Sequence, residues 1–107
     1  MRKIKAALTV STLFVLAGTA VAAGVIQVNQ KNLAFSSDVL RVSKGTKVEF
    51  QNSDATAHNI LITGPGLVFN SGLQRPGVAF TAPFGKPGTY KVNCGIHPKM
   101  KMAVVVK

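Results

Sequence analysis

The segment at positions 93–102 constrains the fold of this chain more than any other part of its sequence. It reads Asn-Cys-Gly-Ile-His-Pro-Lys-Met-Lys-Met and holds the single cysteine, Cys94, followed closely by His97, Met100 and Met102. The second histidine of the chain, His58, lies 36 residues before Cys94, where a polar turn leads into an apolar run. If these side chains act together, the fold must bring two distant segments to one end of a domain.

These residue types together predict a copper site. A cysteine alone is usually an inert, buried side chain. Two histidines and one cysteine with a weak axial methionine, however, are typical of blue-copper electron-transfer centres. Zinc is the weaker interpretation, because it usually takes four firm ligands and, in structural sites, paired cysteines. A ligand set that suits both Cu(I) and Cu(II) reorganises little when an electron arrives, so we expect fast electron transfer.

Residues 1–23 have the three parts of a secretory signal peptide. The basic start consists of Arg2, Lys3 and Lys5. An apolar run follows at 6–17, and small residues follow at 20–23, where cleavage after Ala22 and cleavage after Ala23 are equally plausible. An uncleaved membrane anchor is the less favoured alternative, because the apolar run is short for a bilayer span. We therefore expect export to the periplasm and a mature domain at 24–107 without stable membrane insertion.

The single cysteine fits poorly with an exported domain unless it has a special role. Small domains in oxidising compartments usually carry paired cysteines, and Cys94 has no partner in the chain. Metal ligation explains an unpaired thiol there. The mature chain is also near the lower size limit for a self-sufficient core, and a bound metal would favour its folded state.

The charge balance of the chain is strongly basic. The formal net charge is +10, and loss of the signal peptide leaves ten Lys and Arg residues against three acidic residues, Asp38, Glu49 and Asp54. Nucleic-acid binding is disfavoured, because the chain is exported and its basic residues are scattered. A basic surface would instead guide the domain to an acidic redox protein or to anionic lipid headgroups, although solubility alone explains it equally well. The small size and transient role favour a monomer.

Residues 24–107 alternate between short strands and turns, without convincing helical periodicity. Strand-like runs lie at 25–28, 33–35, 38–42, 47–51, 58–63, 78–81, 89–94 and 102–107. Within 47–51, Val48 and Phe50 should face the core and Glu49 the solvent. Glycines and prolines at 64–77 predict a long loop with at most one turn of helix. Six or seven short strands among these eight runs, separated by turns, predict an all-β Greek-key sandwich or a small barrel.

Four segments, in their order and spacing, resemble the cupredoxins, and most closely the plastocyanin, amicyanin and pseudoazurin group. They are Val-Glu-Phe-Gln-Asn at 48–52, His-Asn-Ile at 58–60, Gly-Thr-Tyr-Lys-Val-Asn-Cys at 88–94 and Cys-Gly-Ile-His-Pro-Lys-Met at 94–100. The resemblance covers nearly all of residues 24–107. It implies a β-sandwich of eight strands or a similar number, with copper at one end. It also implies a periplasmic one-electron carrier that is not an enzyme.

The resemblance further implies one copper ion in a type 1 site, with His58, Cys94 and His97 as equatorial ligands. Two methionines are candidates for the axial ligand. The amicyanin pattern Cys-x-x-His-Pro-x-Met selects Met100, whereas four residues between histidine and methionine, as in plastocyanin and pseudoazurin, select Met102. The short loop favours Met100 and leaves Met102 as a core residue at the start of the last strand.

Three residues beside the ligands carry further expectations. Asn59 matches an asparagine that ties the two ligand loops together in cupredoxins. Gly95 replaces the hydroxyl residue that often follows the cysteine, so one link to the upstream loop should be missing. Ile96 stands where plastocyanin-like loops usually carry proline. Because Ile96 has an N–H, we expect a second N–H···S hydrogen bond to Cys94, which would raise the reduction potential.

The route of the electron follows from the same resemblance. The ring edge of His97 should reach the surface inside an apolar collar, for which Pro98 and residues 64–67 are the candidates. Lys99 and Lys101 would pair with acidic groups on the partner.

Two other functions compete with electron transfer. A periplasmic copper carrier or copper-resistance protein would use the same ligands without passing electrons, but the repeated methionine or histidine tracts typical of resistance proteins are absent from this sequence. A Cys–His nucleophilic enzyme is weaker still, because the chain offers no third catalytic partner of the usual kind.

Overall fold

Short runs that alternate apolar and polar residues form the strands of this protein. The computed structural model describes residues 24–107, and the predicted signal peptide at 1–23 lies outside them. Within 24–107 there are nine strands, and no helix there is long and apolar enough to cross a membrane. The strands are β1 (Val25–Lys31), β2 (Ala34–Phe35), β3 (Val39–Val42), β4 (Lys47–Asn52), β5 (His58–Gly64), β6 (Leu67–Gln74), β7 (Ala79–Pro83), β8 (Gly88–Cys94) and β9 (Lys101–Val106).

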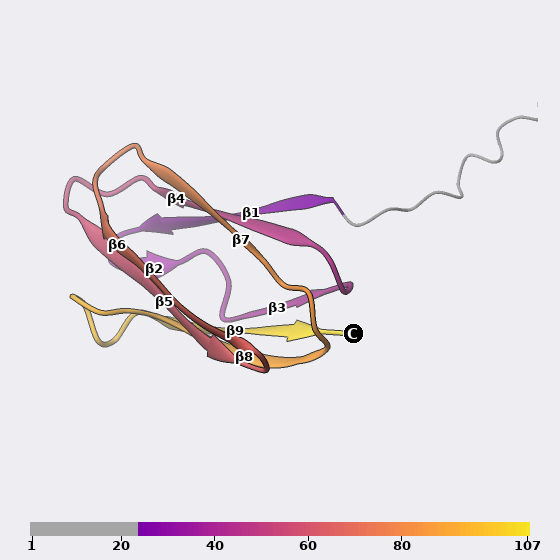
Figure 1. Cartoon of the computed structure of the whole chain (residues 1–107). Helices are drawn as coiled ribbons and strands as arrows, with labels where there is room; N and C mark the ends of the chain where they lie inside the picture. The colour runs from indigo at the N-terminus through magenta and orange to yellow at the C-terminus, as the bar shows by residue number, and fades with distance from the viewer. Residues whose placement is uncertain (1–23) are drawn as a thin grey trace, which may run out of the picture.

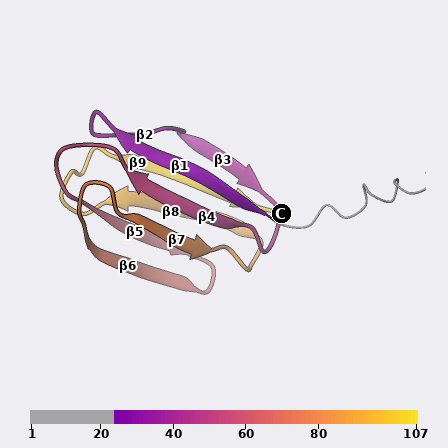
Figure 2. The same cartoon turned by 90° about the horizontal axis from the view of Figure 1, so that it is seen from above.

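Two sheets pack face to face, as Figures 1 and 2 show. The four-stranded sheet has the order β2-β1-β4-β7, and the five-stranded sheet has the order β3-β9-β8-β5-β6. The chain crosses repeatedly between the sheets, which confirms the predicted all-β sandwich. The pairs β1–β4 and β3–β9 are parallel, and the other strand pairs are antiparallel.

The core lies between the sheets. It is made of the side chains that face inward, which are every second residue along a strand. Val48 and Phe50 are fully buried, as predicted, whereas Glu49 between them accepts a hydrogen bond from the side chain of Gln27. Phe80 of the four-stranded sheet stacks on Phe69 of the five-stranded sheet, with ring centroids 4.5 Å apart. Full burial of a side chain such as Val48 or Phe50 stabilises the fold by about 1.5–3 kcal/mol.

Strand β6 occupies much of the segment at 64–77, where the sequence predicted a long loop, so that prediction was wrong. Pro65 and Gly66 fill a two-residue turn, because Gly64 pairs directly with Leu67 across it. Gly66 has φ +66°, a conformation that glycine adopts without strain. The glycine and proline therefore mark a tight hairpin and not a long loop.

A β-bulge explains the glycine within β6, Gly72. Ser71 and Gly72 together face the single residue Ile60 on β5, and Gly72 has φ +74°. The hydroxyl of Ser71 accepts a hydrogen bond from the N–H of Ile60 at 2.9 Å. An edge strand tolerates such an interruption, since only one of its sides is paired.

The end of the sandwich that carries the β5–β6 turn is held together by Tyr90. Its buried hydroxyl donates to the carbonyl of Lys86 at 2.7 Å, and the carbonyl of Pro65 lies 3.2 Å away. The tyrosine ring packs closely against the backbone of Gly64. A β-carbon at Gly64 would lie 2.3 Å from Cδ2 of Tyr90, closer than any non-bonded contact allows.

We expect Gly64→Ala to lower the free energy of unfolding by about 3 kcal/mol, because the tyrosine ring must shift and its hydroxyl bonds must weaken. Urea unfolding of the apo-protein measures this change. Gly85→Ala is the matched control, since nothing lies within 4 Å of its β-carbon position. Equal stability of the two variants would contradict the packing described for Tyr90.

Candidate metal centre

The pairing of β5 with β8 brings two of the predicted ligands together. His58 is the first residue of β5, and Cys94 is the last residue of β8. Because these strands are antiparallel neighbours, with Ile60 opposite Cys94, the start of one lies beside the end of the other. The β8–β9 connection then carries His97 back over the same end, at the left of Figure 1.

The three side chains direct their ligand atoms at one another. The Nδ1 atoms of His58 and His97 lie 3.2 Å apart, and the sulfur of Cys94 lies 3.8 and 3.7 Å from them. A point equidistant from the three atoms is about 2 Å from each, close to ordinary metal–nitrogen and metal–sulfur bond lengths. His58 and Cys94 are buried, whereas His97 is partly exposed. The geometry therefore fits one metal ion in trigonal coordination.

Both candidate axial methionines are buried, but they occupy different places. Met100 closes the ligand loop: its carbonyl accepts from the N–H of Cys94 at 3.1 Å, and its N–H donates to the carbonyl of His97 at 2.9 Å. Met102 is the second residue of β9 and pairs with Val92, farther from the loop. Met100 lies opposite Cys94, one position beyond the pair Asn93–Lys101. Residues directly opposite each other on antiparallel strands share a face, so the side chain of Met100 is closer to Cys94 than that of Met102.

The two ligand segments are tied together by the backbone of Asn59. Its N–H donates to the sulfur of Cys94 at 3.3 Å, and its carbonyl accepts from the N–H of Gly95 at 3.1 Å. Residue 59 thus links the two ligand segments as predicted, but through its backbone and not through its asparagine side chain. Its side-chain amide instead donates to Asn70 on β6 at 3.2 Å.

The predicted hydrogen bond from Ile96 to the cysteine sulfur is absent, so that prediction was wrong. Within 24–107, Asn59 is the residue whose backbone N–H donates to the sulfur of Cys94. The bond from Gly95 to Asn59 holds the first loop residue against β5, and the chain then turns outward. The side chain of Ile96 is consequently 49% exposed.

The missing link predicted at Gly95 is confirmed by an unpaired atom. Oδ1 of Asn59 is buried and accepts no hydrogen bond from the described residues. A β-carbon at Gly95 would lie 3.1 Å from this oxygen and 3.2 Å from Cδ1 of Leu61. A hydroxyl on that carbon would be within donating reach of the oxygen.

We expect Gly95→Ser to be more stable than Gly95→Ala by about 1–2 kcal/mol, because only serine supplies a donor to the buried oxygen of Asn59. Both variants carry the same β-carbon and so the same crowding against Leu61. Urea unfolding of the two apo-proteins isolates the contribution of the hydroxyl. A serine variant that unfolds at the same urea concentration as the alanine variant would contradict this account.

An acidic residue that sequence reasoning missed supports His58. Oδ2 of Asp54 lies 2.8 Å from Nε2 of His58. Burial alone raises the pKa of the Asp54 carboxyl, but its hydrogen bonds with His58, Leu33 and Asn32 outweigh this effect and hold the pKa below its ordinary value. An ionised carboxylate only accepts, so Nε2 carries the hydrogen and Nδ1 keeps its lone pair for a metal. The spacing of four residues before His58 was the available sequence signal.

The surface beside His97 is apolar, but it differs from the predicted collar. A hollow of about 460 Å³ is lined by Leu33, Ile96, His97, Pro98, Lys99 and Met100. Residues 64–67 are not part of it, so that prediction was wrong. Strand β5 is seven residues long and begins at His58, so the turn that follows it lies at the opposite end of the sandwich. Leu33 and Ile96 take the place of these residues.

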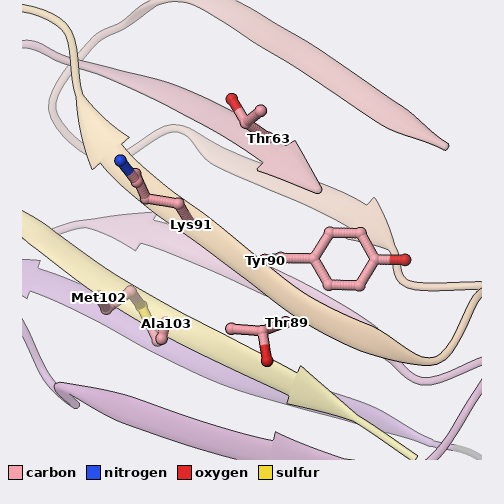
Figure 3. A pocket seen from close by; sticks show the side chains of 6 residues that line it. All are labelled: Thr63, Thr89, Tyr90, Lys91, Met102 and Ala103. Carbon is pink, nitrogen blue, oxygen red and sulfur yellow. The ribbon is translucent and has the colours of Figure 1, made fainter. Parts of the chain in front are cut away.

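A second hollow lies over the five-stranded sheet and has a volume of about 480 Å³. Figure 3 shows the side chains that line it: Thr63, Thr89, Tyr90, Lys91, Met102 and Ala103. None of them is a histidine, cysteine or carboxylate, so this hollow offers no comparable ligand set.

Comparison with known proteins gives consistent similarities. The family model of the cupredoxin-like domain matches residues 5–106. Amicyanin-alpha of Methylorubrum extorquens is 32% identical over 88 residues, which cover 79% of this chain and 74% of the relative. The structure of an amicyanin variant in its reduced Cu(I) form at pH 4 superposes with a TM-score of 0.72 at 28% identity, covering 82% of this chain and 87% of that one.

A copper-containing nitrite reductase from Thermus scotoductus is also similar, but only in part. It superposes with a TM-score of 0.71 at 28% identity and covers 77% of this chain. The present chain spans 22% of that enzyme. The similarity is therefore to one portion of a much longer protein.

Proposed function

The chain belongs to the cupredoxin-like family, and on this basis we propose that it carries single electrons between redox proteins in the periplasm. Its cofactor is copper in a type 1 site. The observation that carries the proposal is the convergence of one cysteine sulfur and two imidazoles, whose ligand atoms all lie within 4.8 Å of one another.

In this proposal His58, Cys94 and His97 hold the copper, and Met100 is the axial ligand. Copper supplies the one-electron chemistry when it is bound. The chain supplies a nearly fixed arrangement of ligands, because β5 and β8 are paired up to the site and Asn59 bridges them. A fixed arrangement suits both oxidation states and keeps the reorganisation small.

The exit for the electron is proposed at His97, the partly exposed ligand. Leu33, Ile96 and Pro98 surround it with apolar surface, and Lys99 adds a positive charge at its side. Apolar contact of this kind permits close but transient docking, and the lysine selects an acidic partner. No catalytic role is proposed, and a monomer suits such brief encounters.

Export to the periplasm is proposed from the signal-peptide pattern at 1–23, with cleavage near Ala22 or Ala23. A copper carrier without electron transfer remains the second candidate function, because it would use the same ligands. Rapid, reversible cycling in a redox titration supports a shuttle, whereas slow or irreversible cycling supports a carrier.

We expect the Cu(II) protein to show an intense visible charge-transfer band, and Cys94→Ser to abolish it, because the band requires a thiolate bonded to copper. Absorption spectroscopy of the copper-loaded proteins tests this expectation.

Met100→Leu should keep the band but raise the reduction potential, since loss of a donor disfavours Cu(II) more than Cu(I).

Met102→Leu is the matched control for the axial ligand, because it makes the same change at a similarly buried position. Its spectrum and reduction potential should stay as in the wild type. A shift in Met102→Leu with none in Met100→Leu would reverse the axial assignment. A colourless wild-type Cu(II) protein would refute the proposed function.

We expect Lys99→Glu to slow oxidation of the Cu(I) protein by hexacyanoferrate(III) by up to about tenfold at low ionic strength, because the change repels an anion near His97. Stopped-flow absorbance at two salt concentrations measures the rate. Lys86→Glu is the control, since Lys86 lies at the opposite end beside Gly66. Equal slowing in both variants would show that net charge matters and that the surface near His97 does not.

A further inference from the structure

The turn between β1 and β2 has an unusual backbone. Its two residues, Asn32 and Leu33, both have φ +57°, and Lys31 pairs with Ala34 across them. Hairpin turns with two positive φ angles favour asparagine and glycine, and the conformation is strained for leucine. Strain of this kind persists only where the surrounding structure imposes it.

The carboxylate of Asp54 imposes this conformation. Oδ1 accepts from the N–H of Asn32 at 2.6 Å, and Oδ2 accepts from the N–H of Leu33 at 3.0 Å. The same Oδ2 lies 2.8 Å from Nε2 of His58. One carboxylate therefore joins the strained turn to the buried imidazole.

Asp54 is itself held in place by the loop before β5. Its N–H donates to Oδ1 of Asn52 at 2.9 Å. The side-chain amide of Asn52, which is buried, donates to the carbonyls of Thr56 and Gln74 at 2.9 and 3.0 Å. Gln74 pairs with His58 in the sheet. The carboxylate thus has a fixed position relative to the imidazole that it contacts.

We propose that Asp54 is a positioning residue of the metal centre: its carboxylate joins the Asn32–Leu33 turn to His58 and holds the imidazole with Nδ1 toward Cys94 and His97. This inference rests on the proposed ligand role of His58. A neutral imidazole offers a lone pair on either nitrogen, and a hydrogen bond at Nε2 leaves it on Nδ1. An amide in place of the carboxylate would either turn a donor toward His58 or lose a bond to the turn.

The test compares Asp54→Asn with Asp38→Asn, which removes the same charge at an exposed position. Cu(I) affinity is measured by competition with a chromophoric chelator, and the Cu(II) spectrum is recorded. Asp54→Asn should bind Cu(I) about 10–100-fold more weakly and show a shifted visible band. Asp38→Asn should stay within about twofold of the wild type, because it contacts no ligand.

A double variant separates positioning from folding. Leu33→Gly removes the strain, since glycine adopts positive φ freely. Added to Asp54→Asn, it should restore the urea midpoint of the apo-protein but leave Cu(I) affinity low. Recovery of affinity together with stability would overturn the inference, as would an Asp54→Asn affinity within threefold of the wild type. A wild-type protein that takes up no copper would instead overturn the proposed function, and this inference with it.

Discussion

The antiparallel pairing of β5 with β8 is the contact on which the metal centre depends. It places His58 at the start of one strand beside Cys94 at the end of the next, and so joins residues that lie 36 positions apart. The backbone of Asn59 continues this pairing past the end of β8, with one bond to the sulfur and one from Gly95. The ligand loop is therefore built at the end of two interior, hydrogen-bonded strands, which gives it little freedom to move. The rigidity that electron transfer requires comes from this ladder.

The part of the fold that the sequence predicts is the part set by local alternation. Val48 and Phe50 are buried as expected because a strand directs every second side chain to the same face. Strand β6 was not predicted, because Gly66 and Gly72 there serve a tight turn and a bulge, and a glycine looks the same in a loop. Whether a glycine lies in a tight turn, a bulge or a loop depends on the strand that pairs with its segment, and the residues of that strand lie elsewhere in the chain.

The candidate site likewise contains residues that the sequence predicts and residues that it does not. His58, Cys94 and His97 were predicted as ligands from their chemistry, and Met100 from its amicyanin-like spacing. The structure brings the ligand atoms of the first three together. Asp54 and Leu33 were missed because their role depends on a turn more than twenty positions from Asp54 in sequence. Residues 64–67 were placed at the wrong end because the length of β5 decides where its following turn lies. Ile96 was misjudged because the bond from Gly95 to Asn59 directs the chain outward.

The bulge in β6 has a consequence for the behaviour of the protein at high concentration. Strand β6 ends the five-stranded sheet, and its side chain Val68 is 86% exposed. A regular edge of this kind can pair with a strand of a second molecule, which promotes aggregation. Ser71 and Gly72 interrupt the even spacing of the free N–H and C=O groups, so an incoming strand cannot form a continuous ladder. The irregularity thereby disfavours self-association of the protein through this edge.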